Sequence, residues 1–248
     1  MIMDEFNLPS YAKQNWNQMS IIELQDYTLA PSGSGSGING FHFALAVGDV
    51  CAIEASNPDD AHQFLRALAT LAMPLKGIYK FKDKKQDFSN YHDVLRCKRK
   101  IGYIAPDAAL ISNITVRQNL LMTRYYFENN LNIDLDNDMR LLCRSFGLEE
   151  KLDKRPAELN SMEAQAAIVI REISKQPLVF LLQQPEDFIG HARFDLLVKI
   201  LNDWIAKQAP IVFLSYDRRL IRRFANRKIL ITDGSLTTVS TRQMGAGE

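Results

Sequence analysis

Short apolar segments alternate with amphipathic segments of helical period along most of the chain. Apolar runs of strand length occupy residues 50–55, 101–105, 178–182 and 211–215. Apolar side chains at helical spacing occur over residues 59–72, 163–174 and 192–207. A continuous apolar strand must be covered on both faces, and the helices between the strands can supply that cover. The sequence therefore predicts an α/β fold, with a mostly parallel sheet between layers of helices.

The two ends and the middle of the chain follow different patterns. Residues 20–30 read as a strand, and Phe41, Phe43 and Leu45 alternate along one face of a second strand. Residues 115–152 are helical in pattern and contain no strand candidate, which predicts an inserted helical subdomain. Asp233–Gly234 predicts a closing hairpin. The expected organisation is a polar leader over 1–20, one domain over 21–238 with a helical subdomain inserted at about 105–163, and a flexible tail over 239–248.

Composition excludes some classes of protein. The 248 residues are 46% hydrophobic, enough to bury one large core, and the net charge of +1 gives no sign of a nucleic-acid partner. The three cysteines follow no metal-ligand spacing, so buried, reduced thiols in a cytoplasmic protein are expected. No run of about 18 apolar residues occurs, so a direct membrane span is not expected.

The glycine-rich segment PSGSGSGING, residues 31–40, looks like a phosphate-binding loop but stands in the wrong context. A P-loop follows a strand, opens a helix and carries Lys and then Ser or Thr after its last glycine. Here the glycines join two predicted strands, and Ile38 and Asn39 follow them. The sequence predicts a flexible linker at this position.

The context of a phosphate loop occurs instead at residues 50–71, where a buried strand runs through a turn into a helix. The turn contains no glycine and no lysine. Asn57 is a favourable N-cap, Pro58 suits the first helical position, and Asp59 and Asp60 place carboxylates in the first turn. The helix is therefore expected to satisfy its own N-terminus. An arriving phosphate would meet two like charges instead of a lysine.

The order of these segments resembles the ATP-binding cassette (ABC) ATPase domain of transporters, over nearly the whole chain from about Ile21 to Val239. GDVCAIEASNPDDAHQFLRALATL is similar to the strand, Walker A loop and helix of that family. RPAELNSMEAQAAIVIREISKQPLVFLLQQPEDF resembles its LSGGQ signature, signature helix and Walker B strand. The resemblance implies a P-loop NTPase-like fold with a parallel sheet core, an N-terminal antiparallel β subdomain and an inserted α-helical subdomain. GLEEKLDKRPAELNSMEAQAAIVIREI also resembles the cassettes of bacterial lipid-trafficking (Mce/Mla-type) transporters.

The residues at the family's functional positions depart from its pattern. By the resemblance, Ala61 takes the position of the Walker A lysine, and His62 takes that of the following Ser/Thr. The positions before them in the same loop hold Asn57, Asp59 and Asp60. Further along the chain, Pro106 takes the place of the Q-loop glutamine. The Ser-Gly-Gly of the LSGGQ signature is replaced by Asn160, Ser161 and Met162. Gln183 takes the place of the metal-associated Asp, Gln184 that of the catalytic Glu, and Tyr216 that of the switch histidine. His62 is expected to cap the helix or pair with Asp59, and Tyr216 and Asp217 are expected to pack against and cap the helix that follows them.

These departures imply loss of ATP hydrolysis and of tight ATP binding. Phosphoryl transfer depends on charge aimed at the transferring group, a glutamine supplies no charge for magnesium, and Gln184 cannot take a proton. No cofactor is therefore expected; ATP and magnesium enter only if the chain is a divergent but active ATPase, which is one alternative. A soluble interaction module is a second alternative.

The resemblance also implies partners. Cassettes of this family pair head to tail, and a membrane permease subunit docks near the Q-loop, here the neighbourhood of Asp107, Leu110, Ile111 and Asn113. The expected role is a non-catalytic subunit of a bacterial transporter-like complex. It would be cytoplasmic and held at the inner membrane by a permease or a second cassette. The basic groups at 98–100 and 218–223 are expected to be solvated faces, with anionic lipid contact as the lesser alternative.

Overall fold

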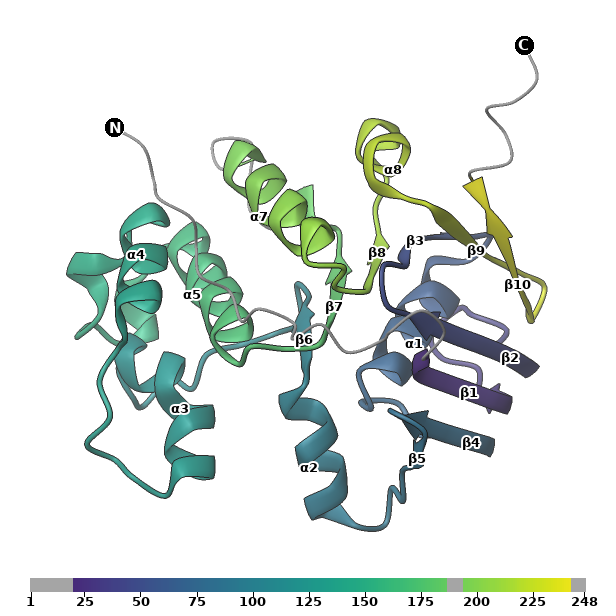
Figure 1. Ribbon diagram of the computed structural model, residues 1–248, viewed down its shortest axis with the longest axis horizontal. Coiled ribbons are helices and arrows are strands. Elements are labelled where there is room, and N and C mark those ends of the chain that lie inside the picture. Colours follow the sequence, from purple (N-terminus) through teal and green to yellow (C-terminus); the bar gives the residue numbers. More distant parts are fainter. Residues whose placement is uncertain (1–19, 187–193, 242–248) are drawn as a thin grey trace.

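The core is a mixed six-stranded sheet (Figure 1). The computed structural model describes residues 20–186 and 194–241. The strand order is β10-β9-β3-β8-β7-β6, with β3, β6, β7, β8 and β9 parallel and β10 antiparallel to β9. Their bounds are β3 (Val50–Ala55), β6 (Ile101–Ile104), β7 (Val179–Gln183), β8 (Ile211–Leu214), β9 (Arg227–Thr232) and β10 (Ser235–Ser240). β9 and β10 form the hairpin expected at Asp233–Gly234.

A second, antiparallel sheet lies beside the core. It contains β1 (Ser20–Leu29), β2 (Ile38–Ala46), β4 (Lys76–Phe81) and β5 (Lys84–Lys85), in the order β2-β1-β4-β5. Phe41, Phe43 and Leu45 all point inward, as their alternation predicts. The Phe43 ring packs edge-on against Phe64 of helix α1 with 5.2 Å between centroids, so this sheet and the core share one apolar cluster.

Helices cover both faces of the core sheet. They are α1 (Pro58–Leu68), α2 (Tyr91–Arg99), α5 (Ser161–Ser174), α7 (Phe194–Ala206) and α8 (Arg218–Phe224). Alternate residues of β7 face opposite clusters: Phe180 and Leu182 lie in one, and Val179 and Leu181 in the other. Phe180 stacks on Trp204 of α7 with ring centroids 3.4 Å apart. The apolar run of β7 is therefore buried on both sides, as a parallel core strand requires.

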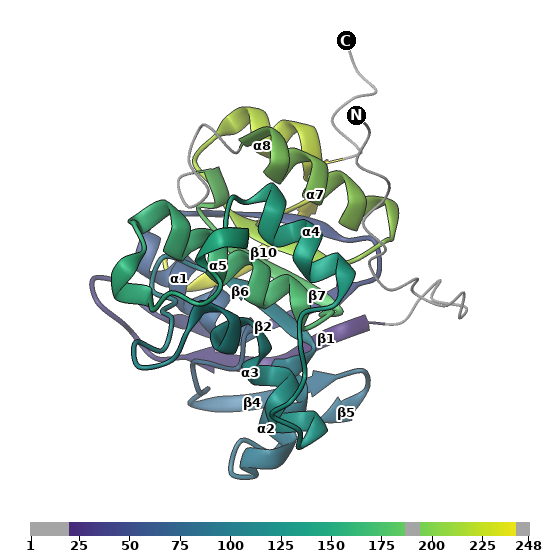
Figure 2. The same cartoon turned by 90° about the vertical axis from the view of Figure 1, so that its left-hand side faces the viewer.

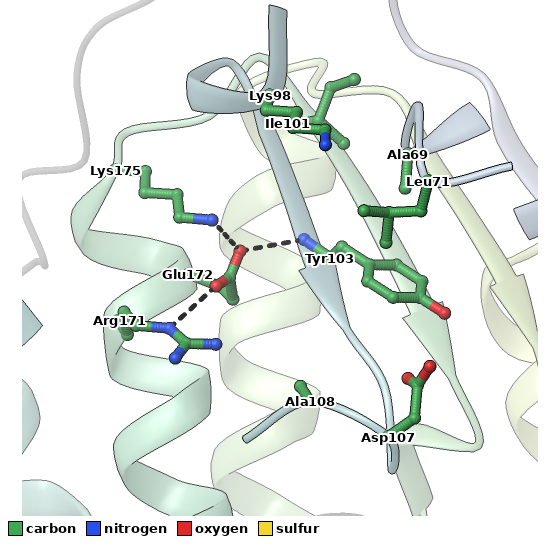
Figure 3. Close-up of a pocket in the computed structure, with 10 residues that line it drawn as sticks. All are labelled: Ala69, Leu71, Lys98, Ile101, Tyr103, Asp107, Ala108, Arg171, Glu172 and Lys175. Carbon is green, nitrogen blue, oxygen red and sulfur yellow. Dashed lines mark hydrogen bonds and ion pairs between the residues drawn. The ribbon is translucent and has the colours of Figure 1, made fainter. Parts of the chain in front are cut away.

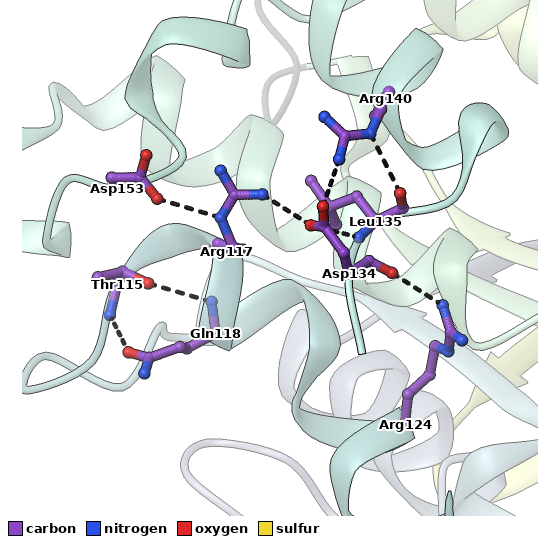
Figure 4. A network of polar contacts seen from close by, with 8 residues as sticks. All are labelled: Thr115, Arg117, Gln118, Arg124, Asp134, Leu135, Arg140 and Asp153. Atoms are coloured by element: carbon purple, nitrogen blue, oxygen red, sulfur yellow. Dashed lines mark hydrogen bonds and ion pairs between the residues drawn. The ribbon is translucent and has the colours of Figure 1, made fainter. Parts of the chain in front are cut away.

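The part of the chain that follows β6 and precedes β7 forms a helical region, which projects from the core (Figures 1 and 2). It contains α3 (Val116–Glu128), α4 (Asn137–Ser145) and the short 3₁₀ helices Glu149–Lys151 and Pro156–Glu158, and it packs on α5. Ion pairs stabilise its surface (Figure 4). Asp134 accepts from Arg117 at 2.8 Å and from Arg140, and Arg117 also pairs with Asp153 at 3.1 Å. These bonds connect α3, the segment before α4 and the segment before α5.

The fold class expected from the sequence is confirmed, and some details differ. Helix α2 was not predicted, because it is strongly polar and only Val94 and Cys97 of its nine residues are buried. Strand β10 continues to Ser240, so the boundary of a tail at residue 239 is wrong. The three cysteines are free and buried, as expected. The expected leader lies outside the described residues, except Ser20, which begins β1.

Candidate functional site

Helix α1 begins with a self-contained cap. Asn57 is the N-cap, and its side-chain oxygen accepts from the Asp59 amide at 2.9 Å. Pro58 occupies the first turn, followed by Asp59 and by Asp60, which is only 4% exposed. The cap predicted from the sequence is confirmed. The carboxylates lie at the end of the helix where backbone amides and the helix dipole favour negative charge.

The glycine-rich segment lies directly over this helix end. Ser34 donates to the Asp59 carboxylate from its amide at 2.7 Å and from its hydroxyl at 2.8 Å. Asn57 donates from its side chain to the Ser34 carbonyl oxygen at 2.7 Å. The amides of Ser36 and Gly37 donate to Asp60 at 3.2 and 2.9 Å. The segment joins β1 to β2 as expected, but the prediction of a plain flexible linker is wrong, since its amides are bound to α1.

The loop changes the electrostatics of the turn. The Ser34 amide and hydroxyl donate to the Asp59 carboxylate and lower its pKa below the usual range, and the nearby His62 contributes in the same direction. Ala61, which the resemblance aligns with the lysine of ABC ATPases, is fully buried and has no side chain that could reach a ligand. The Nε2 atom of His62 is buried with no hydrogen-bond partner among the described residues.

The helix that follows the signature-like segment is capped in a similar way. Asn160 is the N-cap of α5, and its side chain accepts from the Glu163 amide at 2.9 Å. The Glu163 carboxylate in turn accepts from the Asn160 amide at 2.9 Å, which completes a capping box. Ser161 and Met162 open the helix, and the Met162 side chain is 39% exposed. The N-termini of α1 and α5 therefore both carry acidic side chains of the chain itself.

The end of β7 holds Gln183 and Gln184, which the resemblance aligns with the two carboxylates of ABC ATPases. Gln183 is buried, and its side-chain oxygen lies 3.3 Å from the Tyr103 hydroxyl of β6, which donates to it. Gln184 takes a left-handed backbone conformation with φ of 46°, and its amide donates to the Leu214 carbonyl at 2.7 Å. Burial raises the pKa of the Tyr103 phenol, so this hydroxyl stays protonated and remains a donor. The pair Tyr103–Gln183 is neutral.

A carboxylate that the sequence analysis did not single out lies just beyond β7. Oε1 of Glu186 accepts from the Ser215 hydroxyl at 2.8 Å, from the Tyr216 amide at 2.9 Å and from the Asp217 amide at 3.4 Å. Asp217 is the N-cap of α8, as expected, but the Tyr216 side chain is 57% exposed, so the prediction that it packs is wrong. Glu186 binds the Tyr216 backbone and leaves the ring in solvent. The sequence signal that could have identified Glu186 is its position three residues after Gln183, the last residue of β7.

A pocket of about 240 Å³ lies between α1, β6 and α5 (Figure 3). Glu172 lies at its base, 3% exposed, and accepts from Lys175 at 2.5 Å, from Arg171 at 3.1 Å and from the Tyr103 amide at 3.2 Å. The other lining residues are Ala69, Leu71, Lys98, Ile101, Asp107 and Ala108. Lys98 thus borders a pocket and Arg99 lies 4.6 Å from the Phe127 ring centroid, so the basic group at 98–100 is not the plain solvated face that was expected.

The residues expected to dock a permease lie at and beside this pocket. Asp107 is at its rim and pairs with Arg66 of α1 at 2.7 Å. Ile111 and Asn113 are exposed, as is Pro106, whereas Leu110 is partly buried against the core. The sequence analysis missed the neighbouring segment after α1, where three large apolar side chains are exposed: Leu71 at 43%, Met73 at 65% and Leu75 at 69%. Among the described residues, no cluster of three or more potential metal ligands occurs and no helix is long and apolar enough to span a membrane.

No protein-family profile matches the chain. Known proteins are nevertheless similar to it in sequence. The molybdenum import ATP-binding protein ModC of Brucella melitensis is 29% identical over 143 residues, which cover 56% of this chain and 38% of ModC. The lipoprotein-releasing system ATP-binding protein LolD 2 of Chlorobium chlorochromatii is 25% identical over 77% of this chain and 80% of its own length. The chain thus spans well under half of the ModC proteins that it matches.

Solved structures share the fold. The ATP-binding subunit of an ABC transporter superposes with a TM-score of 0.74 at 17% identity, covering 91% of this chain and 94% of that one. The bacterial ABC transporter cassette MJ0796, described as dimeric, gives 0.73 at 16% identity over 88% and 98% of the two chains. The chain therefore has the ABC cassette fold, and its sequence is similar to the ATP-binding proteins of ABC transporters.

Proposed function

We propose that this chain is a non-catalytic cassette subunit of a bacterial transporter-like complex. In this proposal it docks on a membrane permease or a second cassette and does not hydrolyse ATP or bind it tightly. The observation that carries the proposal is the closure of the α1 N-terminus: Asp59 and Asp60 take the place of the anion, and the loop at residues 31–37 covers them. Glu163 fills the corresponding role at α5.

The chemistry at the end of β7 supports the same conclusion. Magnesium prefers carboxylate oxygens, while Gln183 offers a neutral amide that already accepts from Tyr103. Gln184 cannot act as a general base, and loss of such a base typically slows a reaction by about 10²–10⁴-fold. The missing lysine acts on the same transition state, so the losses reinforce one another without being additive.

The exposed apolar segment at residues 71–75, with the adjoining pocket and Ile111, supports a docking role. We infer that a segment of a permease covers it and holds the chain at the cytoplasmic face of the inner membrane. The similar proteins include ATP-binding proteins of molybdenum import and of lipoprotein release. The sequence of residues 147–173 favours lipid as the class of cargo, because it resembles the cassettes of lipid-trafficking transporters.

A divergent, active ATPase is the second candidate, favoured by the ATP-binding proteins among its relatives. The two candidates differ in the effect of Gln184→Glu, which restores a carboxylate at the family's catalytic position. A non-catalytic chain remains at the background rate in both forms, because the phosphate-binding turn is still absent. Steady-state phosphate release by the purified chain and this variant, with and without magnesium, provides the measurement. Turnover that Gln184→Ala abolishes would establish the ATPase and refute the non-catalytic role.

A further inference from the structure

The segment at residues 31–37, named here the Gly-Ser loop, has a shape matched to the two aspartates of α1. A Cβ atom on Gly33 would lie 2.5 Å from the nearest Asp59 carboxylate oxygen. A Cβ on Gly35 would lie still closer to Asp60. Gly33 also has a φ of +59°, a conformation that side chains rarely adopt. Glycine at these two places allows the backbone to approach the carboxylates.

The polarity of the contact is the reverse of that in a phosphate-binding turn. In such a turn, amides at the helix end donate to an anion that comes from outside. Here the helix supplies the anions, and the amides of Ser34, Ser36 and Gly37 converge on them from the loop. Successive backbone amides that converge on an oxyanion form a nest. The Gly-Ser loop is thus a nest whose anions belong to the same chain.

The contact also connects two parts of the fold. The loop leaves β1 and enters β2, both in the antiparallel sheet, while α1 packs against β3, β7 and β8 of the core and also against β1. Asn57 adds a bond in the opposite direction, from α1 to the Ser34 carbonyl oxygen. The loop therefore adds polar bonds between the antiparallel sheet and α1, beside their shared apolar cluster, at the helix end where a phosphate would otherwise bind.

We propose that the Gly-Ser loop is a permanent intramolecular clamp: it occupies the phosphate position above α1 and couples the antiparallel sheet to the core without nucleotide. The proposal deepens the proposed function, on which it rests for the identity of the site. Because the loop is tethered at both ends, its effective concentration at the aspartates is high whether or not ATP is present. The arrangement of the two sheets is then independent of nucleotide.

Amide hydrogen exchange, measured by NMR on the whole chain, tests the clamp. The amides of Ser34, Ser36 and Gly37 are expected to exchange slowly in the unaltered protein. Asp60→Asn keeps the shape of the side chain but can accept with only one oxygen, and Gly35→Ala displaces the loop by steric contact without changing charge. Each variant is expected to increase the exchange rates of the Ser36 and Gly37 amides, which donate to Asp60, by about tenfold or more, the usual effect of losing a hydrogen bond to a charged group.

Two controls separate local opening from unfolding. Amides inside α5 should keep their protection in both variants, which shows that the core remains folded. Asp138→Asn changes an exposed aspartate in the first turn of α4 and should leave the loop amides unchanged.

Two results would overturn the clamp. One is exchange of the loop amides in the unaltered chain at the rate of an unstructured peptide. The other is protection that neither Asp60→Asn nor Gly35→Ala lowers. A titration of the same samples with ATP separates the two claims: ATP bound beside protected amides would refute the inactive site and the loop's occupancy of the phosphate position, and would leave only the attachment of the loop to α1.

Discussion

Replacement of Glu172 by alanine is expected to lower the free energy of unfolding by about 3 kcal/mol, a typical cost of removing one partner from a buried ion pair. Glu172 is 3% exposed and joins α5 to β6 through the Tyr103 amide. Without it, Arg171 and Lys175, themselves 12% and 19% exposed, lose the carboxylate that balances their charge. Chemical denaturation monitored by circular dichroism measures the change.

Two further variants define the cause of that loss. Glu172→Gln keeps an acceptor for the Tyr103 amide but removes the charge, so it should cost less than the alanine variant. Glu149→Ala removes an exposed glutamate that pairs with Arg144 at 2.8 Å, and should cost under about 1 kcal/mol, as surface pairs do. Equal costs for Glu172→Ala and Glu149→Ala would show that the buried cluster does not hold α5 against β6.

Replacement of Leu71 and Leu75 by serine is expected to weaken association with the proposed permease partner by about 10- to 100-fold. Full burial of a leucine side chain contributes about 1.5–3 kcal/mol. A partner can bury only the 43% of Leu71 and the 69% of Leu75 that are exposed, about one full leucine together, and each 1.4 kcal/mol corresponds to about a tenfold change in affinity. Both side chains are already exposed in the free chain, so their replacement should leave its fold intact. The measurement is the amount of an identified integral membrane protein that co-purifies with each variant from detergent-solubilised native membranes.

The control for this experiment is Leu131→Ser. Leu131 is 78% exposed, more than Leu71 or Leu75, but it lies in the helical region between α3 and α4. This variant should retain the membrane partner in full. Loss of the partner in Leu131→Ser to the same degree would show that general surface hydrophobicity, and not the segment at residues 71–75, holds the chain on the membrane.

The elements that the sequence predicted are those rich in apolar side chains. All five residues of β7 are buried, and so are seven of the fourteen residues of α5. Helix α2 was missed because it is strongly polar and buries only Val94 and Cys97 of its nine residues. Local caps, such as Asn57 before Pro58, were predictable because both partners lie within a few residues of each other.

The contacts that the sequence could not predict join residues far apart in the chain. Ser34 and Asp59 are 25 positions apart, and Tyr103 and Glu172 are 69 apart. No local pattern gives the distance between such segments once they fold. The Gly-Ser loop was therefore taken as a linker, although the adjacent acidic pair at Asp59 and Asp60 needed donors that the turn itself does not supply.

Equilibrium titration of the purified chain with ATP, with and without magnesium, tests the central claim most directly. The account predicts no saturable binding at micromolar ATP and no effect of magnesium, because Asp59 and Asp60 repel the phosphates, Ala61 replaces the lysine and Gln183 offers magnesium no charge. Micromolar affinity that requires magnesium would contradict it, since the chain would then possess a working phosphate and metal site.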